Sequence, residues 1–492
     1  MSRTHDLVIA MAAALIPTSC AAQPAAGEDG DLYHGFTRVD PDARQNIPDA
    51  WIVVHDGRIE QVGSGAPPAG DYDRHDMTGL YAMPGLVDAH GHLTAGPQRV
   101  MLVDGKPQIE ITTGDEFSRS NGAIALAFGA TSVRDPGGSA EAAVRYDAMV
   151  ASGAWVGPEA RHAGEIIQPP PFAGQSFAYP KTPAEWDAEA ARQAVAGMTY
   201  FKLYTDLTEE ELALGAHAAK AHGLIPIAHL NGVSWTRALE LGVEQFEHAL
   251  PTSPALLEPE ARTQYTFGPD YMTRWWDLVD LDGPLMREMV ARLVAQQAEV
   301  DLTMMVNELL YFADEWETRF PEFADDLPDY IHPDTLASLE PNYAAMRTIP
   351  PETLARSKLV WPKVLAFAKL LHDSGVRLMI GTDGSGGNGL HYELVNHVRA
   401  GIPAWEVLRM VTSGNAALIG FTDTGRIASG LEADVVFLRA DPVADVRNVK
   451  EVAWVVNNGT LHEHEGLLDI ARQIAVAARA QRAEGGAEVP AD

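Results

Sequence analysis

The sequence contains almost no cysteine. Cys20 is the single cysteine among 492 residues, and it lies close to the N-terminus. The rest of the chain can therefore form no internal disulfide and cannot bind a metal through thiolates. Any metal site in this protein must use nitrogen and oxygen ligands.

Positive charge is scarce as well. The chain carries 36 Lys and Arg against 68 Asp and Glu, which gives a formal net charge of −32. A surface so rich in carboxylates repels nucleic acid and anionic membranes, so we expect neither as a partner. We expect a small-molecule substrate instead, and assembly into a homo-oligomer stays open.

Long apolar runs are missing, and none predicts a membrane-spanning helix. Residues 7–16 form an apolar run of about ten residues behind Arg3, and small residues follow up to Ala22. This pattern predicts a removable export signal over residues 1–22 and hence a periplasmic or secreted protein. The sequence Pro17-Thr18-Ser19-Cys20 resembles a bacterial lipoprotein cleavage site, although Pro17 replaces the usual Leu. Simple secretion and lipid anchoring through Cys20 both stay open.

The chain is too long for one small core and favours a large barrel with a second domain. Residues 31–83 contain alternating stretches and an Asp56-Gly57 turn, which is typical of a β-hairpin. Over residues 84–423 short apolar strands alternate with amphipathic helices. Residues 424–465 return to β patterning, and residues 466–492 predict a helix and a tail. We therefore predict an α/β fold, a (β/α)8 TIM barrel with a β-sandwich domain split between N- and C-terminal strands.

One βα unit is legible in detail. Residues 200–204 predict a strand, and Thr208 with Glu211 forms a capping box that starts a helix ending at Gly223. The next strand follows at residues 224–229. Further strands are predicted at residues 131–134, 243–248, 300–306 and 377–383.

Polar side chains stand at the ends of several predicted strands. In a barrel of this type the C-terminal ends of the strands form the active face. The residues at these ends are His90, His92, Lys202, His229, His248 and Asp383. His90 and His92 project from the same side of an extended segment, a geometry that suits a metal ion.

Lys202 lies in the middle of an apolar strand, where burial of its charge costs several kcal/mol unless something compensates. Two interpretations stay open. Lys202 forms a buried ion pair, or burial keeps its amine uncharged, so that it takes up carbon dioxide and becomes a carbamate. A carbamate offers two oxygens that can bridge two divalent cations.

His229 and His248 follow Lys202 by about 27 and 46 residues, the spacing of adjacent barrel strands. Two histidines at consecutive strand ends are hard to explain as separate core residues. Asp383 follows a hydrophobic strand and precedes Gly384, so small neighbours leave room for a ligand. Asp in a Gly-rich turn is also common without any function.

These segments resemble the metal-dependent amidohydrolase superfamily, and within it the binuclear branch that includes imidazolonepropionase-like and prolidase-like proteins. The resemblance covers nearly the whole chain after the signal. The segments that carry it are residues 82–92 (AMPGLVDAHGH), 131–135 (TSVRD), Phe201-Lys202, Ala228-His229, Glu247-His248, Gly381-Thr382-Asp383 and residues 430–434 (GLEAD).

The resemblance implies a ligand set for two divalent metal ions. It implies that His90, His92 and Asp383 hold one ion, that His229 and His248 hold the other, and that a carbamate on Lys202 bridges them. Zn²⁺ is the expected metal, although nitrogen and oxygen ligands also suit Mn²⁺, Co²⁺ or Fe²⁺. Asp383 would act both as a ligand and as the general acid and base.

Substrate determinants are less clear. Many members of the superfamily carry Gly-Gly-His after the third strand, whereas residues 165–172 contain no histidine here. His391 is a candidate substrate contact, and the Trp275-Trp276 pair either lines the cavity or packs in the core. Residues 307–350 form an insertion that either covers the pocket or builds a subdomain with its own aromatic core. The aromatic residues of this insertion are Tyr311, Phe312, Trp316, Phe320, Phe323 and Tyr330.

The sequence thus predicts an exported, binuclear, metal-dependent amidohydrolase. We expect it to cleave an amide bond in a dipeptide, an N-acyl amino acid or a related small molecule. A lactonase or esterase with the same site is the alternative within enzymes, because an activated water attacks any activated carbonyl. A non-catalytic metal-binding barrel is the alternative outside them.

Overall fold

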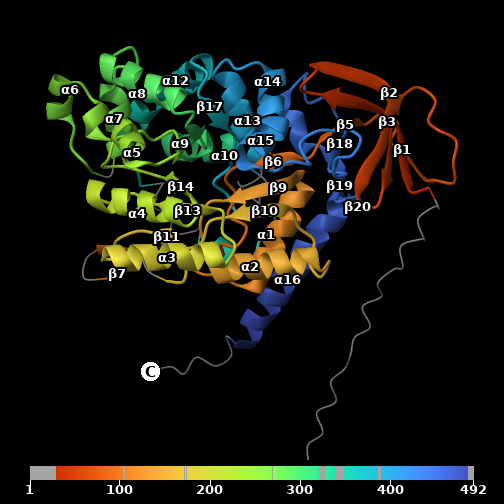
Figure 1. Ribbon diagram of the computed structural model, residues 1–492, viewed down its shortest axis with the longest axis horizontal. Coiled ribbons are helices and arrows are strands. Elements are labelled where there is room, and N and C mark those ends of the chain that lie inside the picture. Colours follow the sequence, from red (N-terminus) through yellow and green to blue (C-terminus); the bar gives the residue numbers. More distant parts are fainter. Residues whose placement is uncertain are drawn as a thin grey trace, which may run out of the picture.

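Two regions of different architecture lie side by side in the computed structural model, a β region and a larger α/β region (Figure 1). The structure describes residues 29–103, 106–170, 172, 174–268, 270–320, 329–338, 348–385 and 389–485. The predicted export signal and Cys20 lie outside the described residues. No helix in the described ranges combines the length and the apolar character that a bilayer crossing requires.

The β region joins strands from both ends of the chain in one sheet of order β20-β19-β18-β5-β1-β2-β3, with β4 paired to β1. Its strands are β1 (Asp31–Asp40), β2 (Gln45–His55), β3 (Arg58–Ser64), β4 (Asp73–Asp76), β5 (Tyr81–Pro84), β18 (Val435–Leu438), β19 (Val452–Asn457) and β20 (Thr460–Glu463). The predicted sharing of strands between the two ends is therefore present. The hydrogen bonding runs through a single sheet, however, where a sandwich would have two, because β5 pairs with both β1 and β18.

The predicted Asp56-Gly57 turn connects β2 and β3. Asp56 and Gly57 have φ angles of 49° and 77°, which match the twist of a two-residue hairpin. One face of the sheet buries Tyr33, Phe36 and Phe437 together, so side chains from distant parts of the chain form its core.

The α/β region contains two parallel sheets. The first has the order β10-β9-β6 and the second β12-β11-β13-β14-β15-β16-β17. These strands are β6 (Leu86–Asp88), β9 (Ala130–Asp135), β10 (Glu159–His162), β11 (Ile166–Ile167), β12 (Phe177–Ala178), β13 (Tyr200–Leu203), β14 (Ile225–Ala228), β15 (Gln245–Glu247), β16 (Glu299–Asp301) and β17 (Arg377–Met379).

Isolated backbone bridges connect the two parallel sheets at two places. Ala163 bridges Tyr200 beside β10 and β13, and Gly91 bridges Gly384 just beyond β6 and β17. Asp383 N donates to His90 O at 2.7 Å at the second junction. A Cβ atom on Gly381 would lie 2.5 Å from His90 N, so only glycine permits this approach. The region thus has a TIM-barrel-type α/β fold.

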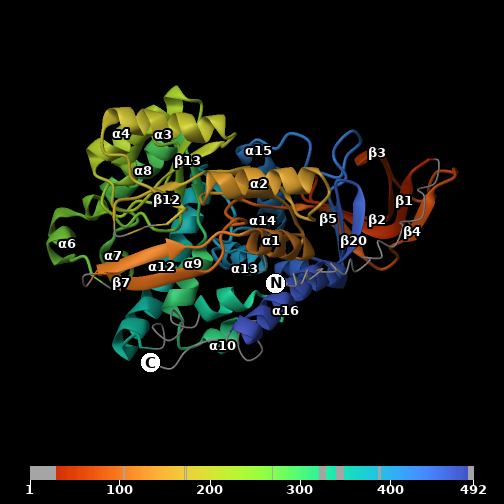
Figure 2. The same ribbon diagram turned by 90° about the horizontal axis from the view of Figure 1, so that it is seen from below.

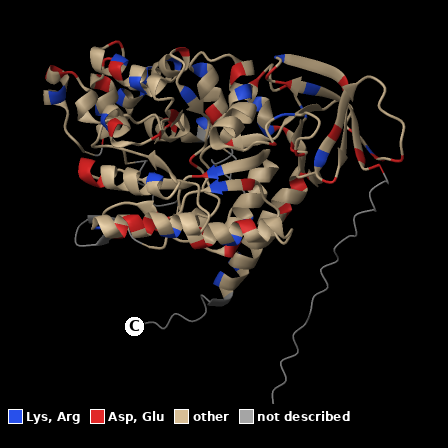
Figure 3. Ribbon diagram, viewed as in Figure 1, with Lys and Arg blue, Asp and Glu red and all other residues tan. Residues whose placement is uncertain are grey.

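Helices follow most of these strands and cover the sheets (Figures 1 and 2). They are α1 (Asp115–Ala127), α2 (Ala140–Ala151), α3 (Pro183–Val195), α4 (Glu209–Ala221), α5 (Trp235–Leu241), α6 (Pro259–Gln264), α7 (Tyr271–Leu278), α8 (Pro284–Ala295), α9 (Met304–Tyr311), α10 (Trp316–Arg319), α12 (Pro351–Asp373), α13 (Leu390–Arg399), α14 (Ala404–Arg409), α15 (Asn415–Ile419) and α16 (His464–Gly485). The capping box of Thr208 and Glu211 starts α4 as predicted. Three acidic residues fill its first turn, and charged residues are spread over the outer helices (Figure 3).

After Glu247 the structure corrects one expectation and decides between two alternatives left open by the sequence. The strand predicted at residues 300–306 ends at Asp301, and α9 begins at Met304. Glu393 explains the change, because its buried carboxylate accepts hydrogen bonds from Met304 N at 2.9 Å and Met305 N at 2.8 Å at the start of α9. Trp275 and Trp276 are fully buried in the main core, so they are packing residues rather than cavity lining.

The described residues of the predicted insertion, 307–320, 329–338 and 348–350, form no separate core. Tyr311, Phe312 and Tyr330 join the main hydrophobic core of the α/β region. Phe323 lies outside the described residues. Residues 329–338 are described, and they contact the C-terminal helix α16 through ion pairs such as Arg472–Asp329.

Candidate metal centre

Two loops at the ends of β6 and β17 bring three predicted ligands together. His90 and His92 follow β6, and Asp383 follows β17. Asp383 Oδ1 lies 3.1 Å from His90 Nε2 and 3.2 Å from His92 Nε2. Ligand atoms of these three residues all lie within 4.8 Å of one another. This arrangement fits one divalent cation bound by two imidazoles and a carboxylate.

The remaining ring nitrogens on this side of the centre have fixed partners. His90 Nδ1 lies 2.8 Å from Asp301 Oδ2, and His92 Nδ1 lies 3.0 Å from Gly137 O. His248 Nδ1 similarly lies 2.6 Å from Thr303 Oγ1. Such outer partners fix the tautomer and the orientation of a metal-binding imidazole. The rings are therefore held in position by the protein itself.

His229 and His248 stand directly after β14 and β15, with ring centroids 4.3 Å apart. The ring of His248 lies 5.0 Å from that of His90, so the second pair adjoins the first group. His229 is buried, and neither of its nitrogens has a hydrogen-bond partner in the described structure. Burial of unpaired polar atoms is costly, and a metal ion would satisfy one of them.

Lys202 reaches the same place from β13. Its side chain is 2% exposed, and its Nζ contacts the carboxylate of Glu247. Burial and, to a smaller extent, the charge of Arg134 lower the pKa of Lys202 to about 7. Both interpretations from the sequence thus find support, because the lysine has an ion-pair partner and an amine that loses its proton easily.

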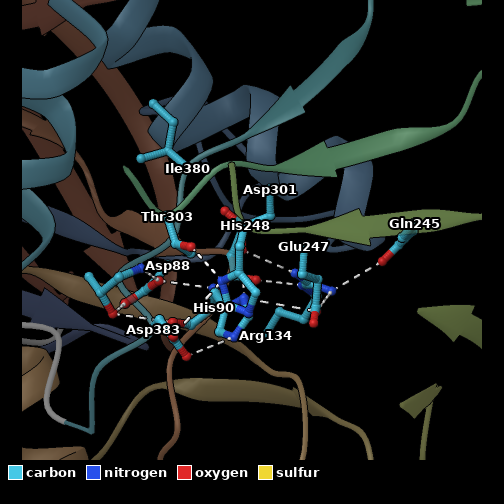
Figure 4. A network of polar contacts seen from close by, with 12 residues as sticks. Asp88, His90, Arg134, Gln245, Glu247, His248, Asp301, Thr303, Ile380 and Asp383 are labelled. Carbon is cyan, nitrogen blue, oxygen red and sulfur yellow. Dashed lines mark hydrogen bonds and ion pairs between the residues drawn. The ribbon is translucent and has the colours of Figure 1, made fainter. Parts of the chain in front are cut away.

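A buried network of charged residues lies behind the ligands (Figure 4). Arg134 is fully buried, and its Nη1 donates to Glu247 at 3.1 Å while its Nη2 donates to Asp301 at 3.4 Å. Arg134 also donates to Gln245, whose amide in turn donates to Glu299. Through Glu247 it reaches Lys202, and through Asp301 it reaches His90. Sequence reasoning missed Arg134, Glu247 and Asp301 as site residues, although each interrupts an apolar strand with a charge.

Glu247 also belongs to a second group of possible ligands. Ligand atoms of His90, Glu247 and His248 lie within 4.8 Å of one another. The predicted set therefore has an additional carboxylate neighbour, which occupies the last position of β15 just before His248.

The backbone is strained at three positions around the centre. His248, Thr303 and Asp383 have φ angles of 66°, 34° and 55°, in the left-handed region that disfavours side chains. Two of them are predicted ligands, and Thr303 contacts His248. Such strain concentrates at functional sites, where the surrounding structure enforces it.

The surroundings of Asp383 and His229 set the protonation state of each. Burial opposes ionisation of Asp383, but His90 and His248 outweigh it and hold the pKa of this carboxyl well below its usual range. Burial and the charge of Lys202 lower the pKa of His229 to about 3. Asp383 is thus a carboxylate and His229 a neutral imidazole, which are the forms that bind metals.

The predicted ligands open into a cavity of about 460 Å³. All six line it, together with Thr335 and Ser338 from the insertion, so part of the insertion does border the pocket. His391 lies on α13 and is not among the lining residues in the described part of the chain. The candidate centre therefore combines nitrogen and oxygen donors for divalent cations with space for a small molecule.

Comparisons with known proteins agree with this geometry. The sequence model of the amidohydrolase family matches residues 81–461. An imidazolonepropionase from Cupriavidus taiwanensis is 34% identical over 147 residues, which cover 28% of this chain and 33% of that protein. The chain thus spans about a third of the length of this relative.

Solved structures extend the likeness in fold to almost the whole chain. A Xaa-Pro dipeptidase with bound methionine in its active site superposes with a TM-score of 0.62 and 20% identity, covering 88% of this chain and 99% of that one. A bottromycin amidohydrolase gives a TM-score of 0.68 and 19% identity, covering 93% and 91%.

Proposed function

Since the chain belongs to the amidohydrolase family, we propose that it is an exported, binuclear metal-dependent enzyme that hydrolyses a carbon–nitrogen bond. The substrate would be a dipeptide, an N-acyl amino acid or a related small amide. One observation carries this proposal: four imidazoles, a carboxylate and a buried lysine from five different strand ends line one cavity. A purely structural barrel has no need to bury these groups side by side.

Two divalent ions, with Zn²⁺ as the expected metal, would be held by this set. His90, His92 and Asp383 would hold one, His229 and His248 the other, and a carbamate on Lys202 would lie between them. The unpaired nitrogens of His229 support the fit. When bound, such ions polarise a carbonyl group and make water a better nucleophile at neutral pH.

The chain's own residues would handle the proton. Asp383 Oδ1 faces His90 and His92, and Oδ2 lies 3.8 Å from His248. Asp383 also lines the cavity, so it can accept a proton from the attacking water and pass it to the leaving amine. Asp301, Gly137 and Thr303 would keep the imidazoles in position during this transfer.

We also propose that the barrel is closed and that the protein is exported. The bridges at Ala163–Tyr200 and Gly91–Gly384 support a closed (β/α)8 barrel. The apolar run at residues 7–16 supports export, with lipid attachment at Cys20 as a second possibility. Cell fractionation of wild type and Cys20→Ser tests this, because a lipid-anchored protein leaves the membrane fraction only in the variant.

Replacement of Lys202 tests the metal centre. In Lys202→Ala we expect metal content to fall below two ions per chain and amide hydrolysis to fall more than about 100-fold. This loss exceeds the one expected for a residue that only supports a metal ligand, which is about 10- to 100-fold. Lys220→Ala is the matched control, because Lys220 pairs with Glu244 on the surface. Thermal unfolding of both variants verifies folding. Full turnover with two bound ions in Lys202→Ala would contradict the proposal.

A parallel panel of dipeptides, N-acyl amino acids and lactones assigns the bond. We expect amides to be hydrolysed and lactones to be poor substrates. Faster hydrolysis of lactones than of amides would instead identify the protein as an esterase or lactonase. Two bound metal ions without any hydrolysis would identify a non-catalytic barrel.

A further inference from the structure

The cavity beside the metal centre has one apolar wall. Rings of Phe177, Phe172, Tyr204 and His229 follow one another with centroid distances of 5.3, 5.9 and 5.0 Å. Ile111 and Ile166 also line this part of the cavity. The wall therefore starts at a predicted ligand and continues outward as an aromatic surface, which suits a flat or branched apolar group.

The rest of the lining is polar but uncharged. Gln98, Thr205, Asn231, Tyr271 and Ser385 contribute amides and hydroxyls. Among the described residues that line the cavity, the charged side chains are Lys202 and Asp383, and both belong to the centre itself. A substrate carboxylate that lies away from the metal ligands, along this uncharged wall, would find no cationic side chain among the described lining residues. There it would lose hydration without a compensating partner.

Asn231 provides an oriented hydrogen-bond donor. Its Oδ1 accepts hydrogen bonds from Thr252 Oγ1 and Tyr271 Oη, both at 3.3 Å. Asn231 itself lines the cavity, and with Oδ1 engaged its Nδ2 is the group left to donate, since no described residue accepts a hydrogen bond from it. An NH₂ group in this position suits a neutral carbonyl oxygen of the substrate.

We propose that the substrate is an uncharged amide with an aromatic or branched aliphatic group, which packs against Phe172, Phe177 and Tyr204 while Asn231 binds a carbonyl oxygen. This inference rests on the proposed function and narrows it. On this basis, free dipeptides and N-acyl amino acids, which carry a carboxylate, are hydrolysed more slowly than their neutral amide derivatives.

Three compounds that differ by one feature each test the inference on the full-length, metal-loaded enzyme. N-benzoylglycine methylamide is neutral and aromatic, N-benzoylglycine adds a carboxylate, and N-acetylglycine methylamide lacks the ring. We expect kcat/KM for the first to exceed that of the second by about 100-fold, the order of effect of one buried polar group left without a partner. Equal or faster hydrolysis of N-benzoylglycine would overturn the inference.

Two variants locate the recognition. Phe172→Ala should lower kcat/KM for the aromatic compound about 10- to 100-fold and leave the acetyl compound unchanged, because the lost contact is apolar. Leu359→Ala on α12, whose side chain is 79% exposed, is the control. Asn231→Leu should raise KM for both neutral compounds at unchanged metal content. Equal losses for both compounds in Phe172→Ala would contradict the apolar subsite.

Failure of the proposed function is distinguishable from failure of this inference. If wild type hydrolyses neither these three compounds nor any amide of the dipeptide and N-acyl amino acid panel, the proposed function fails. Calorimetric binding of the same compounds to wild type then decides the inference by itself. Preferred binding of the neutral aromatic compound supports it, and preferred binding of the carboxylate contradicts it.

Discussion

The two halves of the candidate centre are built differently. On one side, His90 and His92 face Asp383, and their other nitrogens lie against Asp301 and the Gly137 carbonyl. On the other side, His229 has no hydrogen-bond partner in the described structure, and the amine of Lys202 contacts Glu247. The first half is organised by the protein alone. In the second half Thr303 holds His248, but the nitrogens of His229 have no partner unless a further group binds there.

This difference indicates how the centre assembles. A site whose ligands are already oriented binds its ion without rearrangement, which favours affinity. The second half needs both an ion for His229 and a change at Lys202, which must leave Glu247 if it becomes a carbamate. Arg134 remains beside Glu247 in either state, so that carboxylate keeps a cationic partner. We therefore expect the His90 half to bind its metal more tightly.

We expect the largest effect on kcat at Asp383, which we propose as both a metal ligand and a proton acceptor. Asp383→Asn keeps the shape but cannot accept the proton, so we expect kcat to fall about 1000-fold, within the range for loss of a general base. Single-turnover kinetics on enzyme with measured metal content verifies this. A variant that retains both ions and normal kcat would show that Asp383 is only a ligand.

The comparison also shows what sequence can predict about such a site. The gathering of the six candidate ligands at one cavity was predictable, because each lies at or near a strand end and the ends of parallel strands meet at one rim. The contact between Lys202 and Glu247 was not, because it depends on which strands are neighbours and on their register. The roles of Arg134 and Asp301 could not be predicted for the same reason, because the sequence does not reveal which residues a buried charge in a strand contacts.

Fold prediction failed where local patterns were ambiguous. The apolar run after Asp301 fits a strand and a helix equally well by periodicity, and the buried carboxylate of Glu393, 89 residues away from Met304, decides for the helix. The single sheet of the β region depended on β5 pairing with strands from both chain ends, which alternation alone does not reveal. Local signals such as the Asp56-Gly57 turn and the Thr208 capping box were predicted because they need only neighbouring residues.

Arg134 connects the two halves, so its removal should weaken both. Arg134→Met leaves the buried carboxylates of Glu247 and Asp301 without this cation, and we expect a loss of about 3 to 5 kcal/mol in the free energy of unfolding. Urea unfolding of the metal-free protein measures it. Arg145→Met is the control, because the Arg145–Asp115 pair is half exposed and water screens it, so its loss should affect stability far less. Equal effects of the two substitutions would show that the buried network is not structural.

Substitution of one histidine in each half tests the comparison directly. In metal-free protein, His90→Leu removes a partner of buried Asp301 and should cost about 2 kcal/mol. His229→Leu removes a buried imidazole whose nitrogens lack partners, so it should change the free energy of unfolding by less than about 0.5 kcal/mol or stabilise the protein. Both variants should lose metal affinity. If His229→Leu lowered the free energy of unfolding of chelator-treated protein more than His90→Leu does, the two halves would not differ in the way described.

Beyond His92, the organised half continues through Asp135 to His162. We expect the smallest effect here, in the pH dependence of the free energy of unfolding. Burial opposes protonation of His162, but Asp135 and Asp147 outweigh it and raise its pKa to about 9. A raised pKa stabilises the fold fully below the ordinary value near 6.5 and loses this contribution as pH rises through about 9. We expect about 1 kcal/mol, because Asp147 is half exposed and water weakens its share. Urea unfolding at pH 6 and pH 10 should show this loss in wild type and a smaller one in His162→Gln. An unchanged pH dependence in the variant would mean that His162 is neutral in the folded protein and that the organised half ends at Asp135.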